Sequence, residues 1–172
     1  KDSVTTGLLR AAVEVAPPDV NIEIHDLNTI PLYNGDVESQ GIPEGVTALA
    51  HAIRDADAVI IASPEYNYGM TGVLKNALDW ISRPALHGPL RQKPVAIMGA
   101  SGGNWGTSRS QLQLRQTLSS GIDAYTLPKP EIMVPRAPSV FDDDGNLQDD
   151  DVRERIRSQV EALVHWARRL EE

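Results

Sequence analysis

Apolar residues recur along the chain at the spacing of helix faces, in five places separated by other patterns. The first stripe covers 8–16 and ends at Pro17-Pro18, because proline cannot continue a helix. The same periodicity predicts four further helices, at 46–53, 73–81, 108–118 and 152–167.

Extended patterns lie between these helices. Segments 58–63 and 94–100 are apolar at nearly every position, which is typical of strands covered on both faces. Segment 21–27 alternates like a half-buried strand, and 124–134 is extended, with Pro128 and Pro130 favouring an edge position. Alternation of strands with helices predicts an α/β fold with a parallel sheet and helices on both faces.

The order of the elements leaves one strand unaccounted for. A doubly wound sheet of this class begins with a strand in the sheet interior, whereas Lys1 directly precedes a helix. We therefore expect that roughly ten residues upstream of Lys1, one strand and a loop, complete a five-stranded sheet. No repeat, linker or shift in composition divides the chain, so we expect a single domain over 1–172.

Composition excludes several classes of function. The 172 residues carry a formal net charge of −8, so the clustered Lys and Arg of a nucleic-acid-binding surface are absent. There is no cysteine, which excludes disulfides and thiolate metal sites and suits a reducing compartment. No membrane-spanning apolar run or signal-peptide core is recognisable, so we expect a cytoplasmic protein without nucleic-acid or membrane partners.

Three segments with unusual chemistry lie where a strand passes into a helix, the edge at which open α/β sheets bind ligands. At the start of the chain, hydroxyls and N–H groups at a helix N-terminus could hold a phosphate, or Ser3 or Thr5 could simply cap the helix. Segment 63–72 combines two tyrosines with an asparagine, which suits a planar ligand or a loop whose tyrosines cover the core. Segment 99–107 holds four glycines, which permit close approach of a ligand, but it matches neither the dinucleotide fingerprint nor the P-loop.

Other polar residues do not form convincing sites. The four histidines are scattered without i,i+4 pairing, so no metal site is expected. The acidic run at 142–145 lacks the spacing of a calcium loop and is expected to form a turn. Arg109 follows the glycine-rich segment, and we expect it to form a salt bridge rather than contact a nicotinamide phosphate.

The three segments carry a family resemblance. The stretch SPEYNYGMTGVLKNALDWISRP, at 63–84, resembles the signature of the NADPH-dependent FMN reductase family, which includes chromate, azo-dye and quinone reductases. GASGGNWGTSRSQLQLRQTL, at 99–118, is similar to the family's second flavin-contacting loop, and the opening KDSVTTGLLRAA to the end of its phosphate loop. The resemblance implies a flavodoxin-like three-layer sandwich with a five-stranded parallel sheet.

The resemblance also implies which residues hold FMN. Ser3 and Thr5 would contact the phosphate. The first loop would line the ribityl chain and the ring, largely through backbone groups, with Pro64, Glu65, Tyr66, Asn67, Tyr68 and Gly69. The second loop would close over the other side with Ser101, Gly102, Gly103 and Asn104. Two features depart from the family pattern: Thr5 replaces the common Asn, and Trp105-Gly106-Thr107 replaces the usual Gly-Gly.

The function implied is an FMN-dependent oxidoreductase that takes hydride from NADPH or NADH and passes electrons by a ping-pong reaction to a small acceptor. Flavins, quinones, azo dyes and metal oxyanions are the expected acceptors, and a homodimer or homotetramer is the expected assembly. No side chain is expected to act as a catalytic acid or base, because the flavin supplies the chemistry. Two alternatives stay open, an electron carrier that does not react with NAD(P)H and a flavin-free interaction module.

Overall fold

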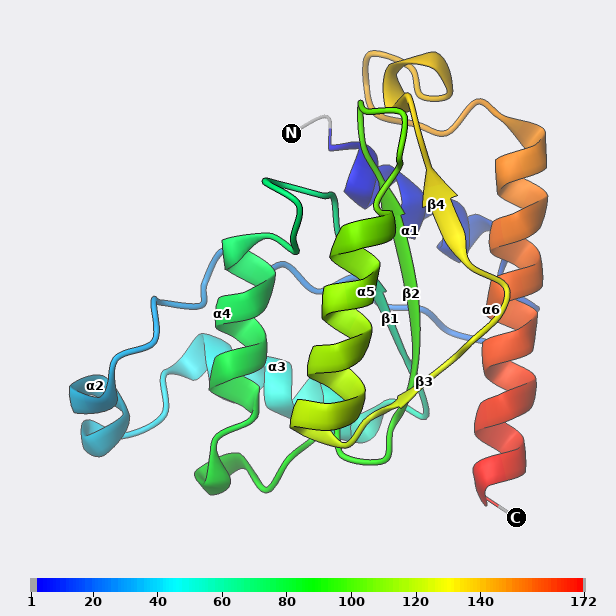
Figure 1. Cartoon of the computed structure of the whole chain (residues 1–172). Coiled ribbons are helices and arrows are strands. Elements are labelled where there is room, and N and C mark those ends of the chain that lie inside the picture. The colour runs from blue at the N-terminus through cyan, green and yellow to red at the C-terminus, as the bar shows by residue number, and fades with distance from the viewer. Residues whose placement is uncertain (1–2, 172) are drawn as a thin grey trace.

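A parallel sheet forms the centre of the protein in the computed structural model, which describes residues 3–171 (Figure 1). Its four strands are β1 (Val59–Ala62), β2 (Pro94–Ala100), β3 (Tyr125–Thr126) and β4 (Ile132–Val134). β1 pairs with one side of β2, and both β3 and β4 pair with the other side. Every residue of β2 is buried, which confirms the prediction of a strand covered on both faces.

β3 and β4 are two parts of the predicted extended segment 124–134. The interruption falls at Pro128 and Pro130, neither of which has a backbone N–H to donate to a neighbouring strand. Opposite the interruption, the buried Gln159 side chain donates hydrogen bonds to the carbonyls of Ile97 and Pro130, at 3.0 and 2.7 Å. The side-chain amide thus gives the Ile97 carbonyl a donor where a proline has no N–H to offer.

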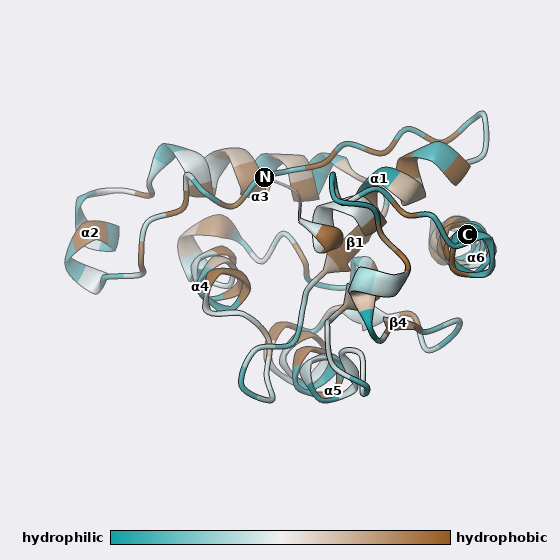
Figure 2. Cartoon of the chain, turned by 90° about the horizontal axis from the view of Figure 1, so that it is seen from above, coloured by the Kyte–Doolittle hydropathy of each residue, from teal (hydrophilic) through white to brown (hydrophobic). Residues whose placement is uncertain are grey.

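Helices cover both faces of the sheet (Figure 2). α1 (Val4–Val15) and α6 (Asp150–Glu171) pack on one face, against Met98 and Ala100. α4 (Gly72–Ile81) and α5 (Ser108–Gln116) pack on the other, against Val95 and Ile97. α3 (Glu44–Asp55) packs beside α4, and the short α2 (Gly35–Gln40) interrupts the long connection before it. All five predicted helices are confirmed, and no helix among residues 3–171 has the length and apolarity needed to cross a bilayer.

The predicted strand at 21–27 is wrong. This segment pairs with no strand among residues 3–171, while the predicted segment 124–134 supplies two strands, so the described sheet has four strands. The fifth strand of the expected sheet is the one predicted upstream of Lys1, outside this sequence. Ile22 packs against the core, but Ile24, on the same predicted face, is 42% exposed. β1 pairs only with β2, and no described strand lies beside its other edge. A strand needs a neighbour to complete its hydrogen bonds, and an alternating sequence alone cannot supply one.

Candidate functional site

The three segments singled out in the sequence lie at one edge of the sheet. Ala62 at the end of β1 pairs with Met98, and Val134 at the end of β4 pairs with Ala100, so the loops after all three strands leave at the same end. Figure 1 shows α1 beginning at this edge as well. Parallel pairing therefore brings the three predicted segments together, as expected for the carboxyl edge of an open α/β sheet.

The loop after β1 contains a tight turn with an uncommon backbone. Tyr66 and Gly69 exchange two backbone hydrogen bonds, of 3.1 and 3.0 Å. Asn67 and Tyr68 between them both have positive φ angles, of 49° and 69°. Asparagine tolerates this conformation, but an aromatic residue adopts it rarely, and such strain is typical of functional loops. The turn leaves the side chains of Tyr66 and Tyr68 exposed.

Glu65 joins the two candidate loops. Its side chain is only 5% exposed. The carboxylate accepts hydrogen bonds from the backbone N–H groups of Arg109 and Ser110, at 2.9 and 3.1 Å, and from Nε of Arg109 at 2.6 Å. Burial alone would raise the pKa of Glu65, but the Ser110 N–H and the donors of Arg109 outweigh it and hold the pKa below its usual value. Glu65 is therefore an anion that caps the N-terminus of α5.

Two residues of α5 complete this connection. The Arg109 guanidinium lies 3.8 Å from the centre of the Tyr68 ring, a cation–π contact, and it also forms an ion pair with Glu65. Gln113, one helical turn further, accepts a hydrogen bond of 2.8 Å from the N–H of Met70. The expected salt bridge of Arg109 is confirmed. Gln113 was not predicted as a site residue. Its i,i+4 spacing from Arg109, which places both residues on the same helix face, is the signal that could have identified it.

Hydrogen bonds within the glycine-rich loop and from Arg136 fix its conformation. Ser101 Oγ donates to the Gly106 carbonyl at 2.7 Å, which closes the loop at its base. Arg136 donates from its backbone N–H to the Gly103 carbonyl at 3.1 Å and from Nε to Asn104 Oδ1 at 2.9 Å. The N–H groups of 102–104 donate to no acceptor among residues 3–171. Arg136 was not among the predicted site residues, since nothing in the local sequence pattern links it to this loop.

The N-terminus of α1 offers further donors at this edge. Ser3 Oγ accepts a hydrogen bond of 3.3 Å from the N–H of Thr6, so its capping role is confirmed. The N–H groups of Val4 and Thr5 have no acceptor among residues 3–171, and Thr5 is half-buried. Lys1 and Asp2, also in this predicted segment, lie outside the described residues.

These observations fit a planar group that carries a phosphate. The N–H groups at the start of α1 suit an anion, because they point outward from the positive end of the helix dipole. The open N–H groups of 102–104 and the exposed tyrosine rings of the first loop suit the edge and the face of a flat ring. FMN combines both features, and a metal ion would require a different set of ligands.

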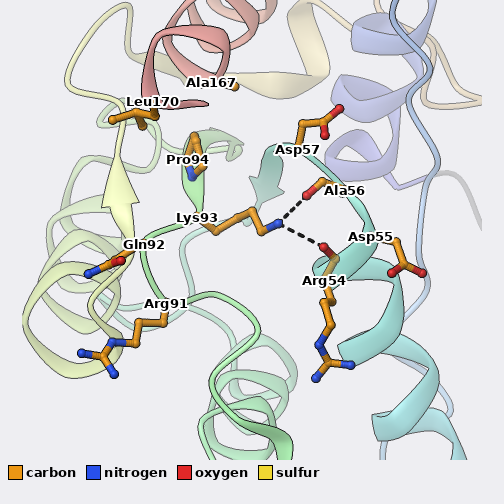
Figure 3. A pocket seen from close by; sticks show the side chains of 10 residues that line it. All are labelled: Arg54, Asp55, Ala56, Asp57, Arg91, Gln92, Lys93, Pro94, Ala167 and Leu170. Atoms are coloured by element: carbon orange, nitrogen blue, oxygen red, sulfur yellow. Dashed lines mark hydrogen bonds between the residues drawn. The ribbon is translucent and has the colours of Figure 1, made fainter. Parts of the chain in front are cut away.

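A cavity at the opposite edge of the sheet, of about 290 Å³, has a structural explanation (Figure 3). Lys93 points across it and donates hydrogen bonds to the carbonyls of Arg54 and Ala56, at the C-terminal end of α3. Arg91 pairs with Asp123 at 3.1 Å. Lysine at a helix C-terminus satisfies free carbonyls and the helix dipole, so these charges stabilise the fold without a ligand.

Comparisons with known proteins find flavin and quinone reductases that are similar to this chain. A family model described as NADPH-dependent FMN reductase matches residues 1–139. An NAD(P)H-dependent FMN reductase of Pseudomonas aeruginosa is 49% identical over 168 residues, which cover 98% of this chain and 90% of that protein. An NADPH:quinone oxidoreductase of Arabidopsis thaliana is 40% identical over 177 residues, which cover 99% of this chain and 88% of that protein.

Solved structures show the same fold. A flavoenzyme NAD(P)H:acceptor oxidoreductase of Paracoccus denitrificans has a TM-score of 0.86 at 28% identity, covering 98% of this chain and 92% of that one. An FMN-dependent NADH-azoreductase of Bacillus anthracis, solved in complex with FMN, has a TM-score of 0.58 at 18% identity, covering 95% of this chain and 90% of that one. The second likeness concerns the fold alone. The predicted flavodoxin-like α/β class is confirmed.

Proposed function

The chain belongs to the NADPH-dependent FMN reductase family, and on this basis we propose how its own residues hold FMN and which acceptors it reduces. It is an FMN-dependent NAD(P)H oxidoreductase. When bound, FMN would supply the hydride-transfer chemistry between the nicotinamide and the acceptor. In the balanced reaction, NAD(P)H and one proton convert a quinone to a hydroquinone and release NAD(P)⁺.

The phosphate of FMN binds at the start of α1 in this proposal. The N–H groups of Val4 and Thr5 and the Thr5 hydroxyl are the donors. One observation supports this placement most directly. These N–H groups lack an acceptor among residues 3–171, and α1 begins at the carboxyl edge of the sheet, where both candidate loops also lie.

The ring binds between the two loops. Backbone groups of 64–69 lie along one side and those of 101–104 along the other, and neither loop needs to contribute a catalytic side chain. The carboxylate of Glu65 is already occupied by α5, so this residue positions the loops and does not contact FMN through its side chain. Asn104 is likewise oriented by Arg136.

Quinones and flavins are the acceptors we propose first, because relatives with these activities cover nearly the whole chain. We also propose one domain over 1–172 and a cytoplasmic location, which a cysteine-free chain suits. A homodimer or homotetramer is supported by exposed apolar side chains: Leu32 and Leu112 are 83% and 68% exposed. A subunit contact would remove them from water.

Titration of the apoprotein tests the binding site. FMN should bind with a visible-band shift and quenched flavin fluorescence, and riboflavin, which lacks the phosphate, should bind much more weakly. T5V should weaken FMN binding and leave riboflavin binding unchanged. T47V is the matched control, since Thr47 is half-buried in the first turn of α3. Equal affinities for FMN and riboflavin would contradict the phosphate site.

Rapid mixing separates the enzyme from an electron carrier. Anaerobic mixing of the holoprotein with NADPH should bleach the flavin band, and addition of a quinone should restore it. A flavin band that persists in NADPH but bleaches with dithionite would favour the carrier alternative.

A further inference from the structure

Large aromatic side chains are unusually exposed at the proposed flavin site. Tyr66, Tyr68 and Trp105 are 64%, 73% and 72% exposed, more than any other aromatic residue in 3–171. All three belong to the two loops at the carboxyl edge of the sheet. Each ring is a large apolar surface left in water, and such residues cluster where a partner or ligand covers them.

The positions of these rings are fixed by the backbone around them. Tyr66 begins the turn closed by the Tyr66–Gly69 hydrogen bonds, and Tyr68 lies within it with its ring against the Arg109 guanidinium. Trp105 precedes Arg109 by four residues, in the loop that Ser101 and Arg136 hold. Loops held in this way display aromatic rings without losing much entropy on binding.

Two arginines lie near this rim, and only one of them is paired: Arg136, which binds Asn104, is exposed and forms no ion pair among residues 3–171. The Arg109 guanidinium pairs with the buried carboxylate of Glu65, so the face beside Tyr68 carries little net charge. The whole chain is strongly acidic, with a formal net charge of −8. A compact anion can therefore interact with Arg136 but gains nothing from the aromatic rings, whereas an uncharged flat ring gains contact with that aromatic surface.

We propose that Tyr66, Tyr68 and Trp105 form an aromatic rim that binds flat, uncharged ring-shaped acceptors, and that Trp105 is the specificity-determining residue. The inference rests on the proposed function and names the acceptor that its site prefers.

Steady-state kinetics with two acceptors of opposite character test the proposal. The holoenzyme is assayed with NADPH and either a naphthoquinone, which is flat and uncharged, or ferricyanide, a compact trianion. In W105A the ratio of kcat/KM for the quinone to that for ferricyanide should fall about tenfold, the scale of one lost aromatic stacking contact. W105F should recover most of the ratio. L170A, which truncates an exposed apolar residue at the opposite edge, should leave it unchanged.

Tryptophan emission supplies a readout that needs no turnover. Of the three tryptophans, Trp80 is fully buried and Trp166 half-buried, so the solvent-exposed emission comes from Trp105. Without NADPH, the naphthoquinone should quench this emission in the oxidised holoenzyme and saturate. In W105F the FMN dissociation constant should stay at the wild-type value, and quenching of the wild-type emission that rises without saturating would contradict the proposal.

The outcomes separate this inference from the proposed function. If the wild type oxidises NADPH with neither acceptor, the proposed function fails. If both acceptors are reduced but the ratio is the same in W105A and wild type, the rim proposal is wrong. If W105A instead weakens FMN binding and slows both acceptors equally, Trp105 covers the flavin, and the proposal is again overturned.

Discussion

Removal of the Glu65 carboxylate tests the connection between the two candidate loops. In E65A the N–H groups of Arg109 and Ser110, at the start of α5, lose their shared acceptor. The Arg109 guanidinium also loses its ion-pair partner and keeps only the Tyr68 ring. The loops after β1 and β2 then have no charged link.

The expected cost follows from burial. Loss of a helix-capping acceptor costs about 1 kcal/mol, and a hydrogen bond to a charged group contributes about 1.5–3 kcal/mol. Removing one partner from a fully buried ion pair lowers the free energy of unfolding by roughly 3–5 kcal/mol, because the other charge is left unpaired. The Arg109 side chain is 35% exposed, however, so water replaces part of what it loses. We expect E65A to lower the free energy of unfolding by about 2–3 kcal/mol and Tm by about 5–10 °C.

Urea denaturation of the apoprotein, followed by circular dichroism, measures this change. D19A is the control, because it removes the exposed Asp19–Arg168 pair and should change stability little. FMN titration of the same proteins should give a dissociation constant at least about tenfold higher for E65A than for wild type. A loss of about 1.4 kcal/mol of binding free energy, caused by the two loops no longer being held together, raises the dissociation constant tenfold. An E65A protein as stable as D19A, with wild-type FMN affinity, would refute the reasoning.

Three further predictions concern pH, close packing and the interrupted strand. Because the folded-state pKa of Glu65 is lowered, its stabilising contribution is present above the ordinary value of about 4.3 and is lost as pH falls through the folded-state value. The difference in unfolding free energy between wild type and E65Q should therefore shrink below about pH 4 in urea titrations. G7A drives a Cβ into the 141–145 turn and should cost about 1–3 kcal/mol in thermal melts, whereas G72A, with open space around it, should be nearly neutral. Q159L leaves two carbonyls beside the interrupted strand without donors and should cost about 2–3 kcal/mol by urea denaturation, and a wild-type value would show that water replaces the amide.

Much of the candidate site could be located from the sequence. Apolar runs predicted where β1 and β2 end, and turn-forming residues directly after them marked 64–69 and 101–104. The partners of these loops could not be predicted. Glu65 binds α5 across 44 residues of sequence, and Asn104 binds Arg136 across 32. A local sequence pattern cannot predict hydrogen bonds between such distant residues, because these bonds depend on which loops the sheet brings side by side.

The sequence by itself determined which faces the helices and strands bury, because periodicity is a local property of the chain and burial of apolar surface enforces it. Only the tertiary structure decided that 21–27 forms no strand, that 124–134 divides into β3 and β4, and that Glu65 is an anion held by α5. Each of these depends on hydrogen-bond partners supplied by a distant segment. Whether a backbone or carboxylate group finds such a partner is determined by the packing of the whole chain.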